Sequence, residues 1–127
     1  MIRTDANGFF IVIGQRDYEN WQIIDRAKEV IREDKTKSAW WFHLDNHPSS
    51  HVILIFSSDL TEPTVEMIDM AAAACKKHSK LKNAMNVSVV YGPIGGVKKG
   101  DSVGSVIIVE KLMKRIGDSA YPHTPTL

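Results

Sequence analysis

The stretch AWWFHLDNHPSSHVILIFS, residues 39–57, decides the fold. Two apolar segments rich in β-branched and aromatic residues, 39–44 and 51–57, flank the turn-forming hexapeptide 45–50. Pro48 lacks the N–H group that the ladder of a sheet requires, so the chain is expected to leave the sheet there. The stretch therefore predicts two neighbouring strands joined by a polar loop.

The residues before this stretch predict a hairpin and a helix. Segments 1–4 and 9–13 are strand-like and flank Asp5-Ala6-Asn7-Gly8, and Asn-Gly between such segments is a strong hairpin signal. Apolar residues then recur at steps of three and four over 19–33, which predicts a helix. We expect Trp21 to anchor that helix to the sheet.

A second helix is predicted after the central strands. Thr61-Glu62-Pro63-Thr64 is a suitable helix start, since proline is tolerated in the first turn. The expected buried stripe consists of Val65, Ile68, Ala72, Cys75 and Ser79. Lysines 76, 77 and 80 are expected in the last turns, where positive charge also suits the helix dipole.

The remaining residues predict further strands. Segment 86–91 alternates as a strand, and 92–101 reads as a glycine-rich, lysine-bearing loop. Segments 103–110 and 113–116 are expected to pair as a closing hairpin, and 117–127 to form a flexible tail.

Helices separated by hairpins, without alternating βαβ spacing, indicate an α+β fold. We expect a mainly antiparallel β-sheet built from hairpins, with two main helices packed on one face. At 127 residues the chain has room for one domain, placed at 1–116.

Composition excludes several classes. Hydrophobic residues at 43% and charged residues at 24% are ordinary globular values. No apolar run approaches the roughly 18 residues of a membrane span, and the N-terminal residues do not read as a signal peptide, so we expect a cytoplasmic protein without a membrane partner. The only cysteine, Cys75, excludes an internal disulfide.

The positive charge is concentrated in one block. The net charge is +1, but residues 71–100 hold six lysines and no carboxylate. Folded onto one face, such a block attracts phosphates. A solvated helix face that happens to be basic is an equally good interpretation of charge alone.

Three histidines at intervals of four, His43, His47 and His51, raise the question of a metal site. Pro48 and the turn residues break the helix that would align them, and no further ligands or supporting groups are recognisable. We therefore expect no metal and no other cofactor.

The segment Gly92-Pro93-Ile94-Gly95-Gly96-Val97-Lys98-Lys99-Gly100 superficially suggests a phosphate loop. A P-loop opens a helix, and the Gly-x-x-Gly loop of KH domains lies between helices, whereas strands are expected on both sides here. Glycine backbone N–H groups and the two adjacent lysines still suit phosphate oxygens. An ordinary hairpin loop is the alternative.

An ordered string of short signatures carries a family resemblance. They are Trp41-Phe42-His43, Pro48-Ser49-Ser50-His51-Val52, Ala71 to Ala74, His78-Ser79-Lys80, Val89-Val90-Tyr91 and Val97-Lys98-Lys99-Gly100. In this order the string, over about residues 11–116, resembles the NFACT-R domain. That domain is the RNA-binding module of ribosome quality-control proteins such as nuclear export mediator factor and the fibronectin-binding protein A-like factors. The resemblance agrees with the α+β expectation.

The resemblance, together with the position of Lys76 near Lys80 and of Trp41 on its strand, indicates a set of nucleic-acid-binding residues. They are Lys98, Lys99, His51, His43, Ser79, Lys80, Lys76, Trp41 and Asn20. Alternatives stay open for several: the histidines also suit bonds to a turn backbone, and Asn20 suits a helix cap. Trp40 and Trp41 are adjacent on a strand, so we expect one to face inward and the other outward. An exposed one is a candidate for stacking on a base, whereas cover by a helix is the commoner environment of tryptophan.

Together these features predict an RNA-binding protein with tRNA or rRNA as ligand, in translation or ribosome quality control, with the large ribosomal subunit as a further partner. The alternatives are a duplex DNA-binding module and a protein-interaction subunit with an acidic partner. No nucleophile beside a base, carboxylate pair or dinucleotide fingerprint identifies a reaction, so we expect a binding protein rather than an enzyme.

Overall fold

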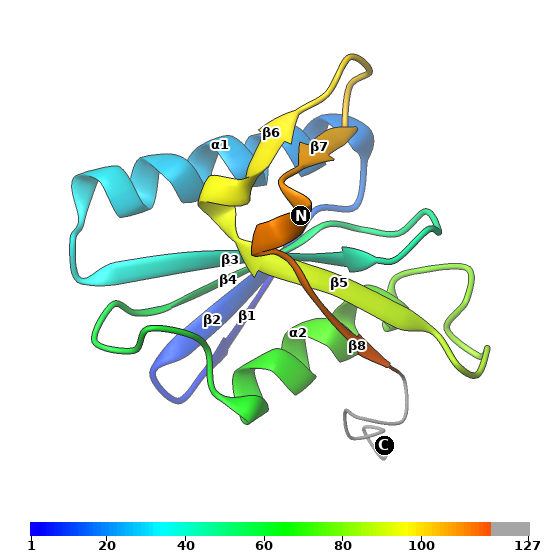
Figure 1. Cartoon of the computed structure of the whole chain (residues 1–127), viewed down its shortest axis with the longest axis horizontal. Helices are drawn as coiled ribbons and strands as arrows, with labels where there is room; N and C mark the ends of the chain where they lie inside the picture. The colour runs from blue at the N-terminus through cyan, green and yellow to red at the C-terminus, as the bar shows by residue number, and fades with distance from the viewer. Residues whose placement is uncertain (118–127) are drawn as a thin grey trace.

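The computed structural model describes residues 1–117, which form two α-helices, two short 3₁₀ helices and eight strands (Figure 1). In chain order these are β1 Ile2–Ala6, β2 Phe9–Ile13, α1 Asp17–Glu33, β3 Lys37–Leu44, β4 Val52–Ser57, α2 Val65–Lys77, β5 Ser88–Pro93, η1 Ile94–Gly96, β6 Val97–Lys99, β7 Val106–Ile108, η2 Glu110–Leu112 and β8 Lys114–Gly117. The α+β expectation is confirmed. Gly117, expected in the tail, ends β8, and the rest of the expected tail, 118–127, lies outside the described residues.

Six strands form one antiparallel sheet in the order β1-β2-β4-β3-β5-β8. The two strands predicted from residues 39–57 are its central pair, with Phe42 opposite Val52. The N-terminal hairpin is also confirmed: Ala6 pairs with Phe9, and Gly8 takes a φ of +80°, which the Asn-Gly turn requires.

The two helices cover opposite faces of the sheet, so the expectation of one covered face is wrong (Figure 1). Met67, Ala71 and Cys75 of α2 pack in one cluster with the face that carries Trp40 and Phe42. Ile23, Ile24 and Ala27 of α1 pack in a second cluster with the face that carries Trp41. The reason is that β3 and β4 are apolar at consecutive positions, and both faces of such strands need cover.

The C-terminal strands pair differently from the prediction. β7 pairs with β6 in a separate two-stranded sheet above α1, and β8 pairs with β5 at the edge of the main sheet. The expected hairpin between 103–110 and 113–116 is therefore wrong. Segment 92–101 is likewise not one loop, because β5 continues to Pro93 and β6 occupies Val97–Lys99.

Two expectations for the helices need correction. The buried side of α2 contains Met67, Ala71 and Ala74 besides the expected Ala72 and Cys75, whereas Val65 is exposed. Trp21 anchors α1 to the β6–β7 connection and not to the main sheet, since its Nε1 donates to the Ser105 carbonyl oxygen at 2.8 Å. Neither helix within residues 1–117 has the length and apolar character needed to cross a membrane.

Candidate nucleic-acid interface

The loop between β3 and β4, residues 45–51, is held at one end of the sheet. The backbone N–H of Asp45 donates to the Ser88 carbonyl at the start of β5, at 2.8 Å. The Leu44 N–H donates to Ser49 Oγ at 3.1 Å, which ties the loop to the end of β3. The exposed side chains of His47 and Pro48 are thereby presented to solvent from a braced loop.

His51 lies beneath this loop and joins three elements. Its Nδ1 accepts from Trp41 Nε1 at 3.0 Å, and its backbone N–H donates to Asn20 Oδ1 at 3.2 Å. Its carbonyl accepts from the Gly14 N–H at 3.0 Å. Burial, with a smaller contribution from His43, lowers the pKa of His51 to about 3, so the ring is neutral at pH 7 and carries its proton on Nε2.

His43 lies between His51 and the surface. Its ring meets the His51 ring edge-on with centroids 4.6 Å apart, and stacks with the Trp41 ring at 5.7 Å and 9°. Its Nδ1 lies 2.6 Å from the Leu44 carbonyl oxygen and donates to it, and burial lowers its pKa. The ring is therefore neutral at pH 7 and leaves Nε2 as an acceptor.

Three side chains differ in environment from the prediction. Trp41 is 2% exposed and Trp40 is 8% exposed, so neither tryptophan presents an open face to a base. Both are covered because each face of the sheet has a helix. Asn20 does not cap α1, whose N-cap is Arg16; it is buried and holds the His51 backbone instead.

Two hollows flank the loop, and His47 and Pro48 line both of them. The first, here called the histidine hollow, has a volume of about 430 Å³. It is lined by Trp41, His43, Leu44, Asp45, Asn46, His47, Pro48, Val90, Val106, Ile108, Glu110 and Arg115. It brings together the predicted Trp41 and His43.

The second, here called the serine–lysine hollow, has a volume of about 840 Å³. It is lined by Gln15, Asp17, Asn20, His47, Pro48, Ser49, Ser50, His78, Ser79, Lys80, Leu81 and Lys82. It brings together the predicted Asn20, Ser79 and Lys80. His51 lines neither hollow. It bonds to one residue of each, Asn20 of the serine–lysine hollow and Trp41 of the histidine hollow.

The turn after α2 positions the lysines of the serine–lysine hollow. Ser79 Oγ donates to the Lys76 carbonyl at 2.7 Å and accepts from the Leu81 N–H at 3.1 Å. Ser79 and Lys80 thus follow α2, which ends at Lys77, and do not lie in its last turn as expected. Ser79 has a structural role in this turn, and Lys80 is exposed beyond it.

Lys98 and Lys99 lie on β6 and line neither hollow. Lys99 Nζ lies 3.0 Å from Asp25 Oδ2 and 5.4 Å from the centre of the Trp21 ring, so it ties β6 to α1. Lys98 is exposed, and within residues 1–117 its ammonium group has no partner. Lys76 lines neither hollow, although its carbonyl holds Ser79.

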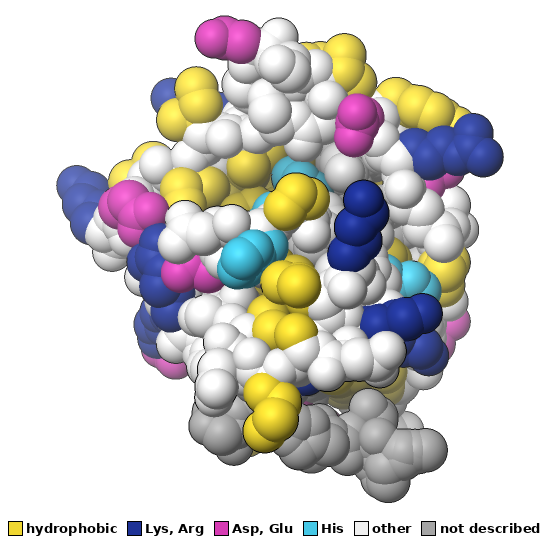
Figure 2. Space-filling view, turned by 90° about the vertical axis from the view of Figure 1, so that its right-hand side faces the viewer, with side chains coloured by type: hydrophobic (Ala, Val, Ile, Leu, Met, Phe, Trp, Pro, Cys, Tyr) yellow, Lys and Arg dark blue, Asp and Glu magenta, His cyan; other side chains and the backbone are white. Residues whose placement is uncertain are grey.

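The surface at this end of the molecule, the right-hand side of Figure 1, mixes side-chain types. Figure 2 shows histidine side chains near the centre of that face, with lysine or arginine side chains on either side of them. Among the described residues, no group of three or more His, Cys, Asp or Glu side chains could hold a metal ion. His43 and His51 pack against each other and each takes part in a hydrogen bond within the fold.

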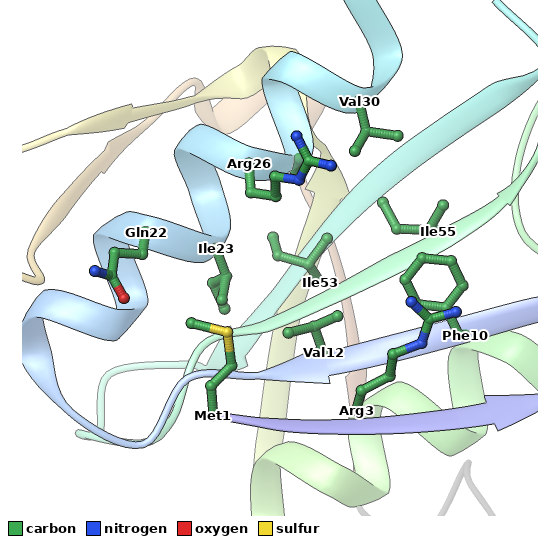
Figure 3. Close-up of a pocket in the computed structure, with 11 residues that line it drawn as sticks. Met1, Arg3, Phe10, Val12, Gln22, Ile23, Arg26, Val30, Ile53 and Ile55 are labelled. Atoms are coloured by element: carbon green, nitrogen blue, oxygen red, sulfur yellow. The ribbon is translucent and has the colours of Figure 1, made fainter. Parts of the chain in front are cut away.

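A third hollow, of about 650 Å³, lies between α1 and the uncovered edge of the sheet (Figure 3). It is largely apolar and contains none of the predicted binding residues. Its two arginines are each paired with a carboxylate, Arg3 with Asp5 and Arg26 with Glu29. It therefore offers little unpaired charge to a phosphate.

Sequence reasoning missed several lining residues. Lys82 belongs to the basic block of residues 71–100, which was a usable signal. His47 stands beside Pro48 in the turn and was considered only for a metal. No sequence pattern indicated Arg115, because its position in the hollow depends on the pairing of β8 with β5.

The sequence profile of the NFACT protein RNA binding domain matches residues 2–113. The chain belongs to the NFACT-R family. Membership supports a general RNA-binding role for this NFACT-R chain. A comparison with curated proteins found no match.

Among solved structures, the C-terminal region of the fibronectin/fibrinogen-binding protein from Streptococcus suis is similar to this NFACT-R chain, with a TM-score of 0.69 and 23% identity. The match covers 86% of this chain and 40% of that chain. At this identity the likeness shows the fold that the two chains share.

Proposed function

We propose that this NFACT-R chain binds tRNA or ribosomal RNA in the cytoplasm, in translation or ribosome quality control, through the surface around residues 45–51. The observation that carries the proposal is the serine–lysine hollow. There the chain brings Ser79 and Lys80, from the basic block, against the serines of the β3–β4 loop.

The hollow suits phosphate groups. Lys80 and Lys82 are exposed, and among residues 1–117 neither ammonium group has a partner. The imidazole groups of His47 and His78 beside them can contact a sugar–phosphate backbone without reading its sequence. The one acidic side chain in the lining is Asp17, so positive charge prevails.

Binding should be electrostatic in origin. About 3 to 5 phosphate contacts, each with a slope of roughly 0.7 to 0.9 in log K against log salt, weaken affinity by about 1.3 to 2.7 orders of magnitude between 50 and 200 mM salt. A flat salt dependence would contradict a lysine–phosphate mechanism.

The test is titration of fluorescent bulk tRNA at both salt concentrations, with charge-reversal variants. Lys80→Glu/Lys82→Glu should abolish most of the salt-sensitive binding. The matched control is Lys35→Glu/Lys37→Glu, which makes the same change of charge at the opposite end of β3. Equal losses in both variants would mean that only overall charge matters.

The contribution of β6 is measured with Lys98→Glu alone. Lys99 is excluded from this test because it pairs with Asp25. Lys99→Glu would place two carboxylates side by side and disturb the packing of β6 on α1. Weaker tRNA binding by Lys98→Glu would mean that the RNA-binding surface includes the β6–β7 hairpin. Failure of the folded wild type to bind tRNA at 50 mM salt would remove the RNA proposal and favour an acidic protein partner.

A further inference from the structure

The histidine hollow differs from the serine–lysine hollow because it offers little unpaired positive charge. Its one arginine, Arg115, is engaged by two carboxylates, Asp45 and Glu110. Phosphate binding therefore does not explain this hollow. Its shape and chemistry instead suit a flat heterocycle with polar edges.

The floor of the hollow is a row of residues across three strands. His43 on β3 pairs with Val90 on β5, and Val90 pairs with Arg115 on β8. The three side chains share one face of the sheet, since paired residues point the same way. The imidazole of His43 is half-buried and neutral, so it can stack on a base without carrying charge into the hollow.

The walls are aliphatic and come from the second sheet. Val106 and Ile108 lie on β7, which β6 holds in register. Lys28 Nζ donates to the Val97 carbonyl at 2.6 Å, and Trp21 Nε1 bonds Ser105, so both ends of the hairpin are tied to α1. The hollow is thus formed before any ligand arrives, which reduces the cost of ordering on binding.

One hydrogen-bond donor and one hydrogen-bond acceptor lie at the edge of the hollow. Arg115 Nε donates to Asp45 Oδ2 at 2.9 Å, and Arg115 Nη2 donates to the Glu110 carboxylate at 3.0 Å. This leaves Arg115 Nη1 and Asp45 Oδ1 without a partner among the described residues. The bonds between Arg115 and the two carboxylates hold these remaining groups in place.

We infer that the histidine hollow binds one unpaired purine base of the RNA, with guanine preferred. Guanine presents acceptors at O6 and N7, which arginine binds, and donors at N1 and N2, which a carboxylate accepts. Its faces would stack on His43 and pack against Val106 and Ile108. The volume of about 430 Å³ lies in the range of roughly 300–1,000 Å³ of small-ligand sites. The inference rests on the proposed function for RNA as the natural ligand.

The experiment is a titration of the whole chain with each of the four nucleoside monophosphates and with inorganic phosphate, followed by NMR. The indole N–H resonance of Trp41 reports on the hollow, since that ring stacks with His43. Guanosine monophosphate should shift this resonance and bind about tenfold or more tightly than uridine monophosphate. No shift, or equal shifts with all four nucleotides and with phosphate, would overturn the inference.

Two variants separate this inference from the proposed function. Asp45→Asn removes the carboxylate acceptor and should abolish the guanine preference, whereas the control Asp59→Asn, on the loop after β4, should not. Val106→Phe fills the hollow without changing charge and should abolish nucleotide binding. Both should keep the salt dependence of tRNA binding that Lys80 and Lys82 confer, while losing the part of the tRNA affinity that a base in the histidine hollow contributes. Retained guanine preference in both variants would overturn the inference and leave the RNA proposal intact.

Discussion

At the scale of single residues, His51 links the parts of the interface. It is 4% exposed and bonds Trp41, Asn20 and Gly14, which lie on or beside three separate elements. A buried ring in this position must stay neutral, because charging it without solvent is costly. The stability of the fold therefore depends on pH through this residue.

The first prediction is that the wild type loses about 2 kcal/mol of unfolding free energy between pH 7 and pH 5 through His51. The unfolded ring has the ordinary pKa of 6.5 and the folded ring about 3. Between these values the unfolded state binds the extra proton, so stability is full above 6.5 and falls as the pH drops toward 3. Urea denaturation at the two pH values measures the difference.

The comparison for this prediction is His51→Gln, whose amide oxygen can accept from Trp41 but does not titrate. The variant should lose about 2 kcal/mol less than the wild type over the same pH interval. An equal loss in both proteins would mean that other groups carry the pH dependence.

The second prediction concerns two glycines with positive φ. Gly8 at +80° has open space around an added Cβ, whereas at Gly104, at +90°, the Cβ would lie 2.8 Å from Asp17 Cα. Gly8→Ala should therefore cost about 1 kcal/mol from backbone strain alone. Gly104→Ala should cost about 2 to 4 kcal/mol, since overlap with the start of α1 is added. Thermal unfolding of both variants shows which one is destabilised more. Equal losses of stability would mean that the β6–β7 connection moves away from α1 freely.

At the scale of elements, the β6–β7 hairpin is the part whose position was hardest to foresee. It is tied to α1 through Trp21, Lys28 and Lys99 and forms one wall of the histidine hollow. None of these ties is local in sequence. Its attachment to α1 nevertheless determines whether that hollow exists.

The third prediction is that Trp21→Phe loosens this hairpin. The variant removes the indole donor to the Ser105 carbonyl, a net loss of about 1 kcal/mol. Amide hydrogen exchange should accelerate several-fold in β6 and β7 while β3 and β4 stay protected. The control is Tyr18→Phe on the same helix, whose exposed ring leaves the hairpin ties intact. Uniform acceleration across the sheet would contradict a local role.

The sequence indicated where helices and strands lie better than which surfaces they cover. Consecutive apolar residues in β3 and β4 predicted strands, but the same pattern also required a helix on each face, which the one-face interpretation overlooked. The adjacent tryptophans show the consequence. Their alternation was expected correctly, yet both are buried because both faces are covered.

At the scale of the whole molecule, positive charge is unevenly distributed along the chain, although the net charge is only +1. Of the six lysines in residues 71–100, Lys80 and Lys82 reach the serine–lysine hollow, whereas Lys99 is paired with Asp25. The lysines of the basic block therefore differ in environment, some lining the hollow and one pairing within the fold, and sequence alone does not separate them.

The fourth prediction is that tRNA competes better than duplex DNA for the interface. Duplex DNA offers phosphates to Lys80 and Lys82, but its bases are stacked and cannot enter the histidine hollow, whereas tRNA loops contain unpaired bases. Unlabelled tRNA should displace labelled tRNA at about a tenfold lower nucleotide concentration than duplex DNA at the same salt. Equal competition would instead favour the duplex DNA-binding alternative.

The sequence by itself determined the α+β class, the Asn7-Gly8 hairpin and the central strands around residues 45–50, because each follows from short-range patterns of turn formers and apolar residues. Its family signatures also predicted His43 and Lys80 as binding residues, and these line the histidine hollow and the serine–lysine hollow. Only the tertiary structure decided the pairing of β8 with β5, the burial of His51 and the two hollows. These depend on contacts between residues far apart in the chain, and local patterns do not encode which distant strand or helix face will cover a given side chain.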